Sequence, residues 1–181
     1  MSESKDQKWT VATATPEQAE GLAAVQAAAM YDTYYRDGDD EFNALLKQGT
    51  ELYLTADRLQ LRRQLIEHAS ETTNDEIYLS VVNAIDEVIG ILFGKENELL
   101  VLYTDKKYRR QGIGRALLER YIDWSDHEKP IELGVIDDNL NAQKFYEHMG
   151  FRIVPDSLHP FADAPMMNEL TMIRPPQKEI L

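Results

Sequence analysis

The segment KKYRRQGIGRALLERYI, residues 106–122, joins a cluster of cations to a Gly-x-Gly and then to an amphipathic pattern. Five basic residues stand within ten positions, although the whole chain carries 32 acidic residues against 19 basic ones. They are Lys106, Lys107, Arg109, Arg110 and Arg115. The apolar stripe that follows predicts a helix over about residues 112–126. Because the first N–H groups of a helix lack intrahelical partners and lie at the positive end of its dipole, this start favours a pyrophosphate.

Two other phosphate-binding loops do not fit these residues. A P-loop requires G-x-x-x-x-G-K-[ST], and the sequence contains no such match. A dinucleotide-binding Gly-x-Gly-x-x-Gly would place its third glycine at Leu117, and about seven residues separate the preceding strand from Gly112. The remaining alternative to phosphate binding is that Gly112 and Gly114 only ease a turn and helix packing, with the arginines in solvent.

Hydrophobic periodicity predicts an alternation of strands and helices on both sides of this segment. Strands are expected over residues 8–14, 76–82, 87–94, 98–104, 131–136, 151–155 and 168–175. Further helices are expected over residues 16–30, 56–69 and 140–149. The acidic, aromatic segment 31–42, which contains Gly38, is expected to be a loop or a broken helix. This order predicts a mixed sheet with helices on its faces, in one domain over residues 1–181 with a motif-bearing core at about 76–155.

Composition narrows the classes of function. A net charge of −13 argues against nucleic-acid binding and suits either a cationic partner or simple solubility. The absence of cysteine excludes disulfides, thiolate metal sites and a cysteine nucleophile. The sequence shows neither a signal-peptide pattern nor a membrane-spanning run, so we expect a cytoplasmic protein without a membrane partner. Four scattered histidines without a known metal or hydrolase motif make a metal site or a hydrolase a poor interpretation: His68, His127, His148 and His159.

Two motifs in the correct order resemble those of the GNAT superfamily of acyl-CoA N-acyltransferases. Residues 109–118, RRQGIGRALL, match the family's [QR]-x-x-G-x-[GA], and residues 139–151, NLNAQKFYEHMGF, are similar to its N-x-x-A-x-x-x-Y-x-x-x-G-F. The motif-bearing resemblance covers about residues 98–155. It implies a GNAT-like α/β (mixed α+β) fold, with a central, mixed, mostly antiparallel twisted sheet of about seven strands flanked by helices.

The resemblance further implies acetyl-CoA, or another acyl-CoA, as the donor substrate. Backbone groups of residues 102–104 would line the pantetheine and thioester, the amides of residues 110–115 would hold the pyrophosphate, and Asn139 would contact the pantetheine arm. Tyr146 would protonate the leaving sulfur as general acid, although its place on an apolar stripe also suits core packing. The predicted donor site is therefore Leu102, Tyr103, Thr104, Arg109, Arg110, Gln111, Gly112, Ile113, Gly114, Arg115 and Asn139.

The general base is where the sequence departs from some members of the family. One family pattern has a glutamate five residues before the motif asparagine, and Gly134 stands there. Another has it fourteen residues before the first motif glycine, where Glu98 stands. We therefore predict Glu98 as the base, acting directly or through water, with an exposed strand-end glutamate as the alternative.

The resemblance also places the acceptor cleft beside residues 31–41 and about 156–168, the latter containing His159, Phe161 and Asp163. Aromatic faces and carboxylates there would suit a cationic amine acceptor. The sequence thus predicts an N-acetyltransferase acting on a primary amine of a small molecule or peptide. A catalytically silent acyl-CoA-binding regulator is the alternative, and a homodimer is compatible with either function.

Overall fold

The computed structural model describes residues 8–71, 75–162, 164 and 166–176. The helices are α1 (Ala19–Tyr34), α2 (Asp40–Glu51), α3 (Ala56–Glu71), α4 (Ile113–Trp124) and α5 (Leu140–His148), with 3₁₀ turns η1 (Pro16–Gln18), η2 (Leu52–Leu54) and η3 (Lys106–Tyr108). The strands are β1 (Trp9–Thr13), β2 (Glu76–Asn83), β3 (Val88–Lys95), β4 (Glu98–Thr104), β5 (Ile131–Ile136), β6 (Arg152–Ile153), β7 (His159–Pro160) and β8 (Asn168–Arg174). No helix among these described residues is long and apolar enough to cross a membrane.

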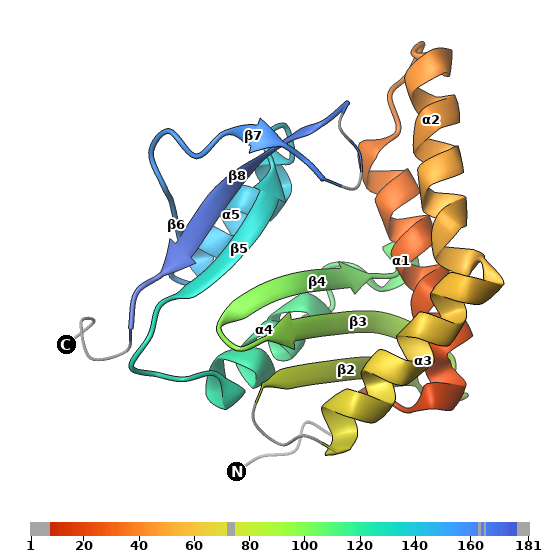
Figure 1. Cartoon of the computed structure of the whole chain (residues 1–181), viewed down its shortest axis with the longest axis vertical. Helices are drawn as coiled ribbons and strands as arrows, with labels where there is room; N and C mark the ends of the chain where they lie inside the picture. Colours follow the sequence, from red (N-terminus) through yellow and green to blue (C-terminus); the bar gives the residue numbers. More distant parts are fainter. Residues whose placement is uncertain (1–7, 72–74, 163, 165, 177–181) are drawn as a thin grey trace.

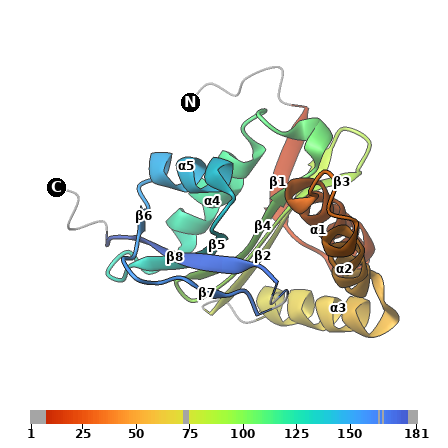
Figure 2. The same ribbon diagram turned by 90° about the horizontal axis from the view of Figure 1, so that it is seen from above.

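The strands form one mixed sheet in the order β1-β2-β3-β4-β5-β8-β6, with the short β7 also pairing with β8. The β4–β5 pair is parallel and the other pairs are antiparallel. Helices α1 and α3 cover one face of the sheet, with α2 packed on α1, and α4 and α5 cover the other face (Figure 2). The predicted fold class is therefore confirmed, and β7 is a strand that the sequence pattern did not indicate.

Strands β4 and β5 diverge soon after they begin. They pair only through Glu98 with Glu132 and Leu99 with Leu133, and then separate (Figure 1). The sheet is thus split between a half that contains β1–β4 and a half that contains β5–β8.

A bulge in β4 lies at the start of this split. Phe93 of β3 opposes Val101 while Gly94 opposes Leu99, so Leu100 is an extra residue in β4. Because of this extra residue, the side chains after Leu100 point to the opposite face of the sheet from the one that regular alternation would give them. Leu99 therefore packs in the core beneath α4, whereas Val101 packs against the core beneath α1 and α3.

The bulge also determines where the backbone groups of β4 point. The N–H of Asp105 donates to the carbonyl of Ile89 in β3, at 2.9 Å. Since backbone groups alternate along a strand, Leu102 and Thr104 turn their N–H and C=O groups away from β3, toward the side where β5 has separated. The edge of the split therefore offers backbone donors and acceptors to a bound molecule.

The segment predicted as a loop or broken helix is a broken helix. Helix α1 continues to Tyr34, and α2 begins at Asp40, after Gly38 at a φ of +80°. The Asp39 carboxylate caps α2 by accepting from the N–H of Phe42 at 3.0 Å. The strand predicted over residues 151–155 is shorter, since β6 spans only Arg152–Ile153. Helix α2 lies mostly within residues 43–54, for which the sequence predicted no helix or strand.

A buried arginine connects α3 to strand β2 and to α1. The guanidinium of Arg62 donates to the hydroxyl of Tyr78 in β2 and, at 2.6 Å, to Oε1 of Gln26 in α1. Arg62 is only 9% exposed, so its N–H groups depend on these partners. This network holds the wall of helices α1 and α3 against β2.

Tyr78→Phe is expected to lower the free energy of unfolding by about 1–3 kcal/mol, because it leaves a buried guanidinium N–H without its acceptor. Urea unfolding followed by circular dichroism measures the change. Tyr35→Phe is the matched control, since Tyr35 is 48% exposed and its loss should change stability by less than about 0.5 kcal/mol. Equal stability of both variants would show that the hydrogen bond between Arg62 and Tyr78 contributes nothing to the docking of α3.

Candidate active site

A cleft of about 1260 Å³ follows the split between β4 and β5 and extends to both faces of the sheet. It is lined by α4 and α5 on one face and by α1, η2 and α3 on the other. Among the thirteen predicted site residues, all but Gln111 line this cleft. The side-chain amide of Gln111 instead donates from Nε2 to the carbonyl oxygen of Lys107, at 3.3 Å. The structure thus brings together residues from β4, the following loop, α4 and α5.

The start of α4 presents a run of free backbone donors. The first hydrogen bond of the helix joins the N–H of Ala116 to the carbonyl of Gly112 at 2.9 Å. The N–H groups of residues 110–115 have no hydrogen-bond acceptor within the described part of the chain. Gly112 has a φ of +84°, which favours glycine, and a Cβ added there would meet nothing within 4 Å. An anion can therefore approach these N–H groups closely.

The cationic side chains around this loop are mostly engaged with neighbouring groups. Arg109 donates to the hydroxyl of Thr33 at 3.1 Å and so links the loop to the end of α1. Two further cations form ion pairs: Arg115 with Glu119 at 2.7 Å, and Lys106 with Asp32 at 3.3 Å. An anion at this loop would therefore be held chiefly by the backbone N–H groups and the helix dipole.

Tyr146 of α5 lies in the cleft wall opposite the free edge of β4. It is 9% exposed, and its ring packs edge-on against Phe151 with ring centres 5.7 Å apart. Burial raises the pKa of its phenol, and the nearby Tyr34 raises it further. Tyr146 therefore holds its proton at neutral pH, which is the state that a general acid requires.

Asn139 connects α5 to α1 across the cleft. Its Oδ1 accepts from the N–H of Ala142 at 3.1 Å and caps α5, while its Nδ2 donates to the hydroxyl of Tyr34 at 3.2 Å. Tyr34 is a site residue that the sequence analysis did not single out. It belongs to the predicted acceptor segment, but nothing in the spacing distinguishes it from Tyr31 and Tyr35.

Glu98 lies at the closed end of the split, where β4 still pairs with β5. It is exposed and stands beside Glu132 in the parallel pair. Burial, followed by the charge of Glu98, raises the pKa of Tyr121 in α4, so the Glu98 carboxylate lies near that phenol. The predicted base is thus in the cleft wall, at its narrow end.

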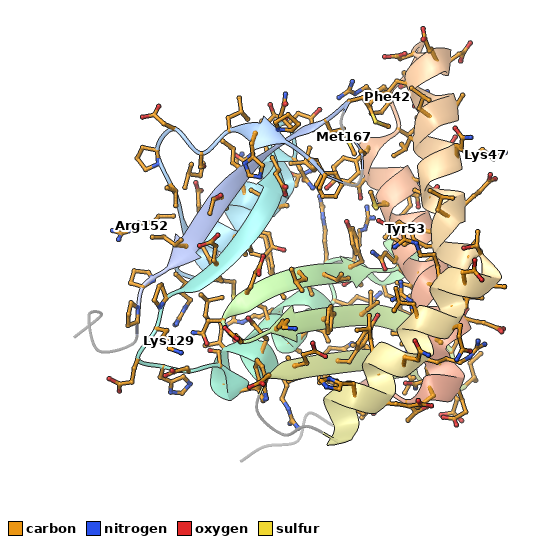
Figure 3. The ribbon with its side chains drawn as sticks, in the orientation of Figure 1. Phe42, Lys47, Tyr53, Lys129, Arg152 and Met167 are labelled. Atoms are coloured by element: carbon orange, nitrogen blue, oxygen red, sulfur yellow. The ribbon has the colours of Figure 1, made fainter. Side chains whose placement is uncertain are left out.

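The predicted acceptor segments border the other face of the cleft. Thr33, Tyr34 and Phe161 line it, together with Tyr53, which the sequence analysis missed. Figure 3 shows Phe42 and Met167 close together where α2 meets the approach to β8, and both belong to one apolar cluster with Phe161. Asp163 lies outside the described residues. Among the residues described, no three histidine or acidic side chains gather so that they could hold a metal ion.

Comparisons with known proteins agree with this geometry. A model of the acetyltransferase (GNAT) family matches residues 30–151. The PaiA N-acetyltransferase from Thermoplasma acidophilum, solved with coenzyme A, superposes with a TM-score of 0.69 at 19% identity, covering 92% of this chain and 98% of that one. The ribosomal-protein-S18-alanine N-acetyltransferase from Escherichia coli superposes with a TM-score of 0.58 at 18% identity, covering 93% and 94%.

A third similar structure is a GCN5-related N-acetyltransferase from Rhodopseudomonas palustris, with a TM-score of 0.70, 13% identity and coverage of 96% and 99%. No curated protein matches the chain significantly. At these identities the structural likeness concerns the fold, whereas the family match spans both sequence motifs. The chain therefore belongs to the GNAT family of acetyltransferases.

Proposed function

We propose that this protein transfers the acetyl group of acetyl-CoA to a primary amine of a small molecule or peptide. The observation that carries the proposal is the run of free N–H groups at residues 110–115, which lies at the end of the unpaired edge of β4. A long molecule with a pyrophosphate at one end and a hydrogen-bonding arm fits this combination. Acetyl-CoA has this construction, and the similar PaiA protein was solved with coenzyme A.

Each part of the site has a separate task in this function. The N–H groups of residues 110–115 bind the pyrophosphate, and the backbone groups of Leu102 and Thr104 hold the pantetheine arm along the split. An N–H at this edge also stabilises the charge that develops on the thioester oxygen. Tyr146 donates its proton to the departing thiolate.

The acceptor enters from the opposite face, beside Tyr34, Tyr53 and Phe161. These aromatic side chains suit a cationic amine in a chain whose net charge is −13. The amine must be neutral to attack, and a lysine-like amine has a pKa of about 10.4 in water. The site therefore needs a group that removes a proton from the amine.

Release of CoA from acetyl-CoA in the presence of a panel of primary amines tests the proposal. A thiol reagent follows CoA directly, because the protein has no cysteine of its own. We expect amine-dependent release, faster with acetyl-CoA than with longer acyl-CoA donors. Binding of acetyl-CoA by calorimetry without release by any amine would instead favour the silent acyl-CoA-binding function.

A further inference from the structure

Glu169 of β8 places a carboxylate in the cleft at a position that the sequence motifs do not indicate. It pairs with Ile136 of β5, so its side chain lies on the face covered by α1 and α2. Gly134, two residues earlier on the same face of β5, provides the space for it. A Cβ added to Gly134 would collide with Oε2 of Glu169. The carboxylate therefore occupies the volume that a side chain at position 134 would fill.

The two oxygens of this carboxylate have different surroundings. Oε1 lies 3.2 Å from Nε2 of His159, which stands directly across from Glu169 in β7. Oε2 points over Gly134 and has no hydrogen-bond partner among the described residues. The Glu169 side chain is only 18% exposed, and it lines the same cleft as Tyr146. One oxygen is thus held in place and the other is available to a bound molecule.

The imidazole of His159 lies between Glu169 and solvent. Its Nδ1 lies 2.8 Å from the carbonyl oxygen of Ser157, which can only accept, so Nδ1 carries a proton. The other ring nitrogen, Nε2, faces Oε1 of Glu169. The His159 side chain is 51% exposed, so the ring reaches water.

Electrostatic interactions connect Glu169 with Tyr34 of α1, and Tyr34 with Tyr146. Burial is the main cause that raises the pKa of Tyr34, and the hydrogen bond from Asn139 opposes it. The charges of Asp138 and Glu169 raise this pKa further, whereas the charge of Arg109 lowers it. Tyr34 in turn raises the pKa of Tyr146. The hydroxyl of Tyr34 therefore lies within electrostatic reach of both Glu169 and Tyr146.

We propose that Glu169 is the catalytic base that accepts a proton from the acceptor amine, with His159 relaying that proton to solvent. This assignment rests on the proposed acetyl transfer. The ammonium form of the acceptor gives one proton to Oε2, and the neutral nitrogen forms a bond to the acyl carbon. As the carbon–sulfur bond breaks, the thiolate takes the proton of the Tyr146 phenol. The second proton lost from nitrogen then restores the protonated phenol. The products are an amide, the CoA thiol and one proton released to solvent.

Two titratable groups interact with Glu169, namely His159 from β7 and Tyr34 from α1. The charges of Asp138, in the turn before α5, and of Arg109 act on the Tyr34 phenol as well. Glu98 lies apart from this group, beside Tyr121 at the narrow end of the cleft. The two glutamates are therefore separable by substitution.

The dependence of kcat/KM on pH, measured for Glu169→Gln and Glu98→Gln, shows which of the two glutamates is the general base. We expect Glu169→Gln to lower kcat/KM about 10²-fold at pH 7. Without a base the enzyme depends on neutral amine from solution, so its rate should rise about tenfold per pH unit up to the amine pKa of about 10. Glu147→Gln is the control, since Glu147 is exposed on α5 and does not line the cleft. It should behave as wild type.

Gly134→Ala tests the position of the carboxylate without removing it. The added methyl must push Oε2 aside, and we expect kcat/KM between those of wild type and Glu169→Gln. In a Glu169→Ala background there is no carboxylate to displace, so Gly134→Ala should cause no further loss. His159→Gln should lower kcat/KM by less than Glu169→Gln does, because the carboxylate that accepts the proton remains.

The outcomes are distinguishable from a failure of the proposed function. If wild type releases CoA with an amine but Glu169→Gln has its rate and pH profile, the assignment of Glu169 is wrong. It is equally wrong if Glu98→Gln alone shows the loss of kcat/KM at pH 7 and the tenfold rise per pH unit. If wild type releases no CoA with any amine, the acetyl transfer itself fails and the assignment with it.

Discussion

Tyr146→Phe is expected to lower kcat about 10³-fold while the Kd for acetyl-CoA stays within about twofold of wild type. The phenol meets the donor only when sulfur leaves, so its loss affects the chemical step rather than binding. Phenylalanine keeps the ring that packs against Phe151, and the fold should therefore be retained. Steady-state kinetics with saturating amine, together with calorimetric titration of acetyl-CoA, measure both quantities.

The direction of the pKa shift of Tyr146 predicts the pH dependence. Burial raises the pKa of this phenol above its ordinary value of about 10, so the acid stays protonated throughout neutral pH. Wild type should show no loss of kcat from Tyr146 as the pH rises toward about 10. Tyr121→Phe is the matched control, because Tyr121 is a fully buried tyrosine that does not line the cleft. A kcat for Tyr146→Phe equal to that of Tyr121→Phe would remove the acid role and leave Tyr146 as a packing residue.

The parts of the site that are local in sequence were predictable. The helix start at Gly112 and the helix that carries Tyr146 each lie within one short motif, and residues 109–118 and 139–151 contain their own turns and caps. Asn139 illustrates this, because its cap on α5 depends on the N–H of Ala142, three residues away. Local hydrogen bonds of this kind follow from residue type and spacing.

The parts that depend on distant strands and helices were not predictable from one sequence. Nothing in ELLVLYT indicates that Leu100 is an extra residue, although this bulge sends Leu99 and Val101 to opposite faces. Glu169 reaches the cleft only because β8 lies beside β5 and because Gly134 leaves space for its carboxylate. Sequence patterns predict which residues share a face within one element, whereas the pairing of elements decides which faces meet.

Gly112→Asp is expected to weaken acetyl-CoA binding about 10²-fold more than Gly112→Asn. The two side chains have the same shape, and both tolerate the positive φ of +84° at this position. They differ in one negative charge, placed beside the N–H groups that would hold the pyrophosphate. At about 5 Å and an effective dielectric constant of about 20, repulsion by one phosphate charge costs about 3 kcal/mol, which corresponds to roughly 10²-fold in Kd. Calorimetric titration of the folded variants measures the difference.

The salt dependence of this difference tests its electrostatic origin. Raising the ionic strength from about 0.1 M to 1 M shortens the Debye length from about 10 Å to about 3 Å, so the gap between the Asp and Asn variants should narrow. Gly112→Asn alone should weaken binding only by the strain and bulk of its side chain, since a Cβ there has open space around it. Equal affinities of the two variants at low salt would show that no phosphate lies at the start of α4. In that case the N–H groups of residues 110–115 would be satisfied by water, and the helix dipole at this point would have no part in donor binding.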